Sequence, residues 1–317
     1  MKAKLNSARA SAPASVGNVG VGFDVLGLAF DAARDTVSVT VEAQPGVRLG
    51  KVSGLVDDLP FAVSKNCALA AAAAVLDAAG ADFGLSVDVH KGVPLSAGMG
   101  GSAASAVAAA GAANAVLDTP FSPEALLPLA MEGEKVSADP PPWDNVMAAL
   151  HGGLVLAARL DPPLIRRLPL PSGVACILFH PERKVETQKA RDLLAPDVAR
   201  GTALEHSRNM AAFVAGCVTN DLDLVASGLK DIFIEPQRLP LLPELADVQA
   251  AALEAGALGC SFSGSGPSVF AWARTEDRDR VEGAMAAAFA AADCKAKSYA
   301  APLDSPGLRI ELLEQVG

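Results

Sequence analysis

The sequence predicts an α+β protein in which helices pack on antiparallel sheets. Segments with strand-like alternation and segments with helical spacing follow one another without a strict strand–helix–strand rhythm, which disfavours a doubly wound parallel sheet. The 317 residues are enough for two domains. The richest group of chain breakers lies at Asp161-Pro162-Pro163 and from Pro169 to Gly173. We therefore expect one domain over residues 1–165 and a second over residues 166–317.

Composition limits the classes of partner. The chain is 51% hydrophobic and carries a formal net charge of −10, which argues against nucleic acid and against an anionic membrane surface as partners. The five cysteines and four histidines show no metal-ligand spacing and no disulfide framework. No apolar signal segment follows the N-terminal cations, and the alanine-led run 68–76 is too short to span a membrane. These features predict a cytoplasmic protein.

The first half is expected to contain strands and helices in alternation. Alternating apolar residues predict strands over Val37–Val41 and Leu85–His90. A helix is expected over Ser64–Ala79 with Ser64 as its N-cap, and a second over Ser102–Leu117, which is rich in alanine. Further elements are expected as follows: a helix opened by Ser122-Pro123-Glu124 and running to about Lys135, an extended loop at Pro140-Pro141-Pro142, a helix over Asp144–Leu150, and a strand over Leu154–Ala158.

The second half repeats this mixture with longer helices. The expected elements are a strand over Val174–Phe179, a helix over Glu186–Leu194, a helical region over Leu204–Phe233 broken near Thr219-Asn220-Asp221, a helix over Leu245–Ala255, a strand–turn–strand over Ser261–Ala273 and a helix over Asp277–Ala292.

A glycine-rich loop joins a strand to the alanine-rich helix. It reads Gly92-Val93-Pro94-Leu95-Ser96-Ala97-Gly98-Met99-Gly100-Gly101-Ser102. The amides at a helix N-terminus have no partner within the helix and favour an anion, and glycine lets the backbone lie close to a phosphate. The loop lacks the lysine of a Walker motif and the spacing of a dinucleotide fingerprint. It predicts a nucleotide site, and the alternative is an ordinary loop with Ser102 as a cap.

Three glycine segments together resemble the three motifs of the GHMP kinase superfamily: Pro13 to Asp24, Pro94 to Ser105, and Ser263-Gly264-Ser265-Gly266-Pro267. Four further segments are similar to those of the homoserine kinases within it: Pro13 to Gly27, Glu132-Gly133 with Asp144-Asn145-Val146, Val185 to Arg191, and Glu235-Pro236-Gln237-Arg238. The resemblance implies an N-terminal α/β domain like domain 2 of ribosomal protein S5 and a C-terminal ferredoxin-like α/β sandwich. It also implies phosphorylation of the L-homoserine hydroxyl by ATP and Mg²⁺, a step of threonine biosynthesis.

The same resemblance implies the nucleotide side of the site. ATP is expected to contact Lys65, Asn66, Pro94, Leu95, Ser96, Ala97, Gly98, Met99, Gly100, Gly101, Ser102, Ser105, Gly264, Ser265 and Gly266. Ser102 and Glu132 are expected to bind the metal, since Mg²⁺ prefers oxygen ligands. The alternatives are a surface pair at a helix start for Lys65 and Asn66, and a solvated helix carboxylate for Glu132.

For the substrate, the resemblance implies Asn18, Asp24, Thr187, Arg191 and Arg238. Asp24 suits an ammonium group, and the two arginines suit a carboxylate, which guanidinium binds bidentately. Asn18 and Asn145 suit the hydroxyl end, and Thr187 adds a hydrogen bond. Surface salt bridges are the alternative for the arginines.

Asp144, Asn145, Glu132 and Ser102 are the expected catalytic residues. Asp144 matches a catalytic aspartate of some relatives but also suits a helix N-cap, so both roles stay open. The resemblance also leaves open that the acceptor hydroxyl loses its proton without a dedicated base. The chain departs from the family at Pro142, where homoserine kinases often have a histidine. A kinase for another small alcohol, such as mevalonate or shikimate, and an inactive ligand sensor are the rival functions. The sequence does not fix the oligomeric state, and a homodimer is compatible with it.

Overall fold

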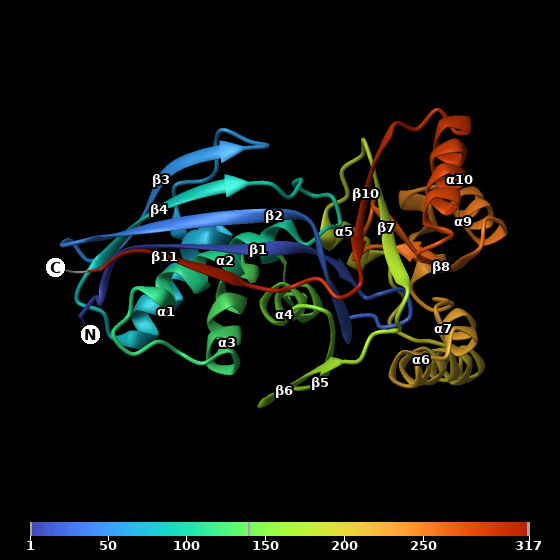
Figure 1. Cartoon of the computed structure of the whole chain (residues 1–317), viewed down its shortest axis with the longest axis horizontal. Coiled ribbons are helices and arrows are strands. Elements are labelled where there is room, and N and C mark those ends of the chain that lie inside the picture. The colour runs from blue at the N-terminus through green and yellow to red at the C-terminus, as the bar shows by residue number, and fades with distance from the viewer. Residues whose placement is uncertain (1, 139, 316–317) are drawn as a thin grey trace.

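The structure, a computed structural model, describes residues 2–138 and 140–315. These residues form one sheet of seven strands and one of four, with helices against both (Figure 1). Among the described strand pairs, β3 with β4 is parallel and the others are antiparallel. The α+β expectation is therefore confirmed.

The first sheet is built around the long strand β2. Its strand order is β11-β1-β2-β4-β3, and β5, which also pairs with β6, joins the beginning of β2. The strands are β1 (Leu5–Gly17), β2 (Leu26–Glu42), β3 (Gly46–Gly54), β4 (Gly84–Lys91), β5 (Leu154–Leu160), β6 (Pro163–Leu168) and β11 (Arg309–Gln315).

Four helices lie on one face of this sheet: α1 (Cys67–Ala79), α2 (Gly101–Ala115), α3 (Pro123–Glu134) and α4 (Trp143–His151) (Figure 1). α2 is central and contacts β1, β2, α1, α3 and α4. Its residues from Ala103 to Asn114 are all buried. A helix buried all round needs small side chains to admit neighbours on every side, and the alanines of α2 meet that need.

The second sheet has the antiparallel order β10-β7-β9-β8. Its strands are β7 (Val174–Pro181), β8 (Ala257–Phe262), β9 (Val269–Arg274) and β10 (Ala296–Pro302). The helices of this half are α5 (Thr187–Asp192), α6 (Arg200–Thr219), α7 (Leu222–Gly228), α8 (Glu235–Arg238), α9 (Leu245–Glu254) and α10 (Arg278–Ala291). The expected break between α6 and α7 is confirmed: Asn220 takes the left-handed conformation and the Asp221 side chain caps α7.

One apolar cluster joins the two halves. Val16 and Leu28 of the first sheet share it with Phe270 and Trp272 of the second. Phe213 of α6 packs its ring on Trp272, with 5.3 Å between ring centroids. Because this shared core holds the sheets together, the loops at its edge are fixed relative to one another.

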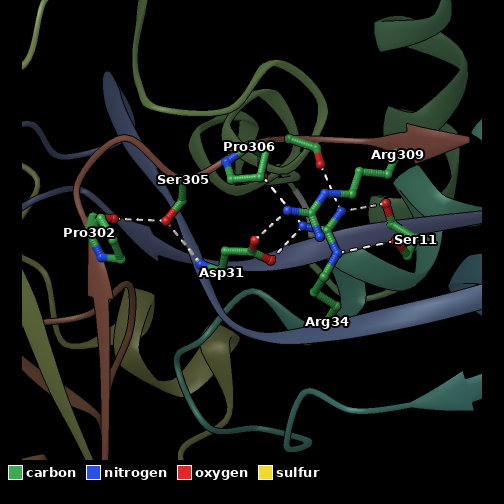
Figure 2. Close-up of polar contacts among 8 residues, drawn as sticks. Ser11, Asp31, Arg34, Pro302, Ser305, Pro306 and Arg309 are labelled. Carbon is green, nitrogen blue, oxygen red and sulfur yellow. Dashed lines mark hydrogen bonds and ion pairs between the residues drawn. The ribbon is translucent and has the colours of Figure 1, made fainter.

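The chain returns to the first sheet at its end. β11 pairs with β1, so part of the expected second domain completes the first sheet. The segment leading to β11 is held by a polar cluster in which Asp31 accepts from Arg34 at 2.6 Å and from Arg309 at 2.9 Å (Figure 2). Arg34 also donates to the Gly307 carbonyl at 2.8 Å. The expected boundary at residue 165 lies inside β6 and stays a prediction.

Two local expectations differ from the structure. The N-cap of α1 is Asn66 rather than Ser64: its side-chain oxygen accepts from the amides of Ala68 and Leu69. The sequence does not predict strands β1, β3, β6, β10 and β11 or the first half of β2. Within the described residues no helix is long and apolar enough to cross a membrane.

Candidate functional site

A cavity of about 460 Å³ opens where loops of the two halves meet. From the first half, it is lined by the residues after β1, the segment before α1, the glycine loop before α2, the end of α3 and the start of α4. From the second half, the segments around α5, Arg238 and Gly264 complete the lining. Each wall therefore comes from a different part of the chain. After the roles expected from the sequence, we call the end at the glycine loop the nucleotide side and the end at Asn18, Asp144 and the arginines the acceptor side.

The glycine loop is shaped by backbone conformations that glycine favours. Gly98 and Gly100 have φ of +70° and +65°, and Gly100 is the N-cap of α2. A Cβ on Gly98 would lie 2.6 Å from the carbonyl oxygens of Ser263 and Gly266. The Ser263 hydroxyl donates to the Gly98 carbonyl at 2.6 Å, so the second and third glycine segments hold each other in place. The N-terminus of α2 then faces the cavity, and a helix N-terminus favours an anion.

A buried ion pair holds both ends of this loop. The Lys91 ammonium donates to Asp35, to the Gly101 carbonyl at 2.9 Å and to Ser105 at 2.9 Å. The other Asp35 oxygen accepts from the amides of Gly92 and Val93, each at 2.9 Å. Asp35 and Lys91 are almost fully buried, and every one of the three ammonium protons has a partner. The pair thus fixes the loop where it leaves β4 and where it enters α2.

Glu134, and not Glu132, lies beside Ser102. The Ser102 hydroxyl donates to Glu134 Oε1 at 2.9 Å, and Ser137 donates to the same oxygen at 2.7 Å. Glu132 points away from the cavity and pairs with Lys135 on the surface at 2.6 Å. The structure therefore brings Glu134, and not the expected Glu132, to the cavity beside Ser102. α3 buries Leu127, Ala130 and Met131, and helical spacing from these positions puts residue 134 on the inner face.

The chemistry of Glu134 fits a divalent cation. Its Oε2 is buried and has no hydrogen-bond partner. Burial raises the pKa of this carboxyl to about 7. A buried carboxylate oxygen without a donor is costly, and Mg²⁺ is a partner that would compensate it. Among residues 2–138 and 140–315 no group of three His, Cys, Asp or Glu side chains gathers to hold a metal, so Glu134 and Ser102 would share the ion with nucleotide oxygens.

On the acceptor side, Asp144 and Asn145 form a buried pair at the start of α4. Asp144 accepts from the Asn18 amide at 2.8 Å and from the Asn145 side chain at 3.0 Å. The Ser15 hydroxyl donates to Asn145 Oδ1 at 2.9 Å, which turns the amide nitrogen toward Asp144. Burial, followed by the Asp24 charge, raises the pKa of Asp144 to about 7. The N-cap of α4 is Pro142, so the capping interpretation of Asp144 is wrong.

Charged side chains from both halves complete the acceptor side. Arg191 of α5 donates to Asp24 at 3.0 Å. Arg238 of α8 is buried and donates to the carbonyls of Ala190 and Gly264, at 3.3 and 3.0 Å. Asn18 also donates to the Gly264 carbonyl, at 2.9 Å. An acid, two arginines and amide groups therefore line one wall.

The remaining predicted residues divide by position. The residues that line the cavity are Lys65, Asn66, Leu95, Ser96, Ala97, Gly101, Ser105, Gly264 and Ser265, whereas Pro94, Met99 and Gly266 are not part of its lining. The Asn66 and Ser105 side chains are engaged in the α1 cap and the Asp35–Lys91 network. The Thr187 side chain lies outside the described part of the structure. Sequence reasoning missed Phe23, Lys91, Glu134 and Ser137, all of which line the cavity.

Comparisons with known proteins agree with this architecture. The family models for the N-terminal and C-terminal domains of GHMP kinases match residues 66–153 and 210–291. The chain is 42% identical over 308 residues to the homoserine kinase of Xylella fastidiosa, covering 96% of this chain and 94% of that protein. It is 42% identical over 309 residues to the homoserine kinase of Xanthomonas campestris, with the same coverage.

A solved structure shows the same fold over nearly the whole chain. The crystal structure of homoserine kinase from Cytophaga hutchinsonii superposes with a TM-score of 0.92 at 36% identity, covering 96% of this chain and 98% of that one. Both the sequence and the three-dimensional arrangement are thus shared from end to end. The chain belongs to the homoserine kinase family of the GHMP kinases.

Proposed function

We propose that this protein transfers the terminal phosphoryl group of ATP to the side-chain hydroxyl of L-homoserine, giving O-phospho-L-homoserine. The observation that carries the proposal is the cavity itself, which joins an anion-binding helix N-terminus to a wall bearing one acid and two arginines. That wall is complementary to the ammonium and carboxylate of an amino acid. The relatives at 42% and 36% identity over 96% of the chain are homoserine kinases.

The nucleotide side would bind ATP through the backbone of the glycine loop and the N-terminus of α2. Lys65 lines the cavity and would contact the base or ribose. Glu134 and Ser102 would hold Mg²⁺ together with phosphate oxygens. When bound, the ion supplies charge neutralisation on the phosphates. Positioning and electrostatics dominate phosphoryl transfer, which suits a site built from fixed backbone amides.

The acceptor side would bind homoserine by exchanging an internal ion pair. Without substrate, Asp24 and Arg191 neutralise each other. A zwitterion can enter between them, with its ammonium on Asp24 and its carboxylate on Arg191 and Arg238. The net charge of the wall stays unchanged by this exchange, so the binding does not strand a charge in the cavity.

The hydroxyl end would lie at Asn145 and Asp144, between the acceptor wall and the glycine loop. Asn145 Nδ2 has a second proton available for the hydroxyl oxygen, because Ser15 and Asp144 fix the amide orientation. We assign proton acceptance to Asp144. Its pKa of about 7 leaves an ionised fraction at neutral pH, and that pKa is close to the value that general-base transfer favours.

A coupled assay of ADP release with Mg·ATP tests the function. Homoserine, mevalonate, shikimate and 3-aminopropan-1-ol are offered in parallel, and phosphorus NMR identifies the product. Homoserine should be turned over with the highest kcat/KM. Faster turnover of another alcohol would overturn the substrate assignment. Tight homoserine binding by calorimetry without ADP release would favour the inactive sensor.

A further inference from the structure

The ring of Phe23 lies against both arginines of the acceptor wall. The guanidinium carbons of Arg238 and Arg191 lie over its face at 5.2 and 5.8 Å from the ring centroid. Both distances are within the range of cation–π attraction. Phe23 lines the cavity and immediately precedes Asp24, the carboxylate partner of Arg191. One side chain therefore touches both cations of this wall.

The two arginines need such a partner. Arg238 is only 3% exposed, and its guanidinium donates to the neutral carbonyls of Ala190 and Gly264. Burial and the neighbouring Arg191 charge lower the pKa of Arg238, and the carboxylates of Asp24, Asp231 and Asp144 offset this lowering only in part. Asp24 neutralises Arg191, and in the proposed exchange the substrate carboxylate takes the place of Asp24. The negative face of an aromatic ring offsets positive charge without competing for the substrate carboxylate.

We propose that Phe23 is a positioning residue that holds the two guanidinium groups as one carboxylate receptor, and that it thereby makes the kinase selective for acceptors bearing a carboxylate. The ring acts through Arg191 and Arg238 and takes no part in the phosphoryl transfer. This inference deepens the proposed function and rests on it. An aromatic ring suits this position better than an acid would. An acid at position 23 would repel the substrate carboxylate, whereas a ring leaves the N–H donors of the arginines free to bind it.

Three substitutions separate the ring face from simple packing. Phe23→Leu keeps an apolar side chain and removes the ring. Phe23→Tyr keeps the ring face. Site-specific 3,4,5-trifluorophenylalanine keeps the shape and removes the negative charge of the face. Phe23→Leu and the trifluoro variant should each raise the KM for homoserine about five- to thirty-fold, and Phe23→Tyr should stay within about threefold of wild type.

The control acceptor is 3-aminopropan-1-ol, which is homoserine without its carboxylate. If the ring works through the arginines, the kcat/KM for 3-aminopropan-1-ol should change little in any of the three variants. The KM for ATP and the melting temperature should also stay near the wild-type values, which excludes a general loss of fold. Calorimetry with homoserine alone gives the same comparison without turnover.

Two outcomes would overturn the inference. One is a trifluoro variant that binds homoserine as the wild type does. The other is a Phe23→Leu variant that loses activity equally on both acceptors, because that result means the ring is only packing. Failure of the proposed function is distinct, since it would appear in the wild-type protein as absent homoserine turnover before any variant is compared.

Discussion

The nucleotide side and the acceptor side of the cavity are built in opposite ways. The nucleotide side comes largely from one continuous stretch, Lys91 to Ser105, held at both ends by the Asp35–Lys91 pair. The acceptor side is assembled from single side chains that lie far apart in the sequence, from Asn18 to Arg238. The first relies on backbone amides and the second on charged side chains.

This difference indicates which side of the cavity binds phosphate and which side selects the acceptor. Backbone amides bind phosphate groups without regard to the rest of the molecule, so one local loop is enough to bind the phosphoryl donor. An amino-acid acceptor requires charges at defined separations, which only the joined sheets supply. Substitutions on the nucleotide side should therefore affect turnover of every acceptor, and substitutions on the acceptor side should change which acceptor is used.

The largest effect is expected for Glu134. Glu134→Gln should lower kcat at least a hundredfold for every acceptor, because loss of a metal ligand removes several kcal/mol of transition-state stabilisation, at about 1.4 kcal/mol per factor of ten. Glu132→Gln, on the outer face of the same helix, is the matched control and should be close to wild type. Steady-state kinetics of the two variants at saturating Mg²⁺ measure the difference in kcat. The reverse result would restore Glu132 as the metal ligand.

Arginine substitutions should affect the acceptor alone. Arg191→Ala and Arg238→Ala should each raise the KM for homoserine about ten- to hundredfold, since a charge-assisted hydrogen bond contributes ~1.5–3 kcal/mol. Lysine should restore only part of the affinity, because it lacks the bidentate fork. The KM for ATP should change little. If ATP affinity falls and homoserine affinity remains, the division of the cavity into two sides is wrong.

The buried acid of the acceptor side predicts a pH-dependent stability. Asp144 has a pKa raised to about 7, so its contribution is favourable below the unfolded-state pKa near 4 and is lost as pH rises through 7. Asp144→Asn has no such charge. Relative to wild type it should gain about 2 kcal/mol between pH 5 and pH 8, roughly 4–8 °C in melting temperature. Differential scanning calorimetry at both pH values measures the change, and a pH-independent difference would contradict the raised pKa.

The smallest effect is expected at the rim of the nucleotide side. Asn66→Ala removes the cap of α1 and should cost about 1 kcal/mol of stability. Ser64→Ala should stay within about 0.5 kcal/mol, because Ser64 caps no helix end. Urea titrations of the two variants compare them directly. A substantial loss in Ser64→Ala alone would move the helix start back to the position expected from sequence.

The sequence allowed the nucleotide side to be predicted more completely than the acceptor side. Glycines near a helix start identify an anion loop from local pattern alone, and the expected helix 102–117 differs from α2 by only a residue or two at each end. The contacts of Arg191 with Asp24, and of Arg238 with Gly264, depend on how two sheets join. Neither contact could be derived from the spacing of residues in the sequence. Only the family resemblance implied that both arginines lie at the same site.

Two errors have local physical causes. Glu132 was preferred because it stands in the Glu-Gly pair, although the buried spacing of α3 points to Glu134. β1 was missed because alanine and proline have low strand propensity. Ala8, Ala10, Ala12 and Ala14 are nevertheless fully buried, at every second position, and that alternation was the available signal. The small side chains are explained by α2, which packs on this strand.

The pairing of β11 with β1 has a consequence for synthesis on the ribosome. The chain emerges from its N-terminus, so β1 has an unpaired edge until residues 309–315 follow, after the whole second sheet. The polar cluster of Asp31, Arg34 and Arg309 can form only then (Figure 2). A nascent chain stalled before this point presents an open strand edge to other chains, which is a route to aggregation. The last strand therefore protects the first during every round of translation.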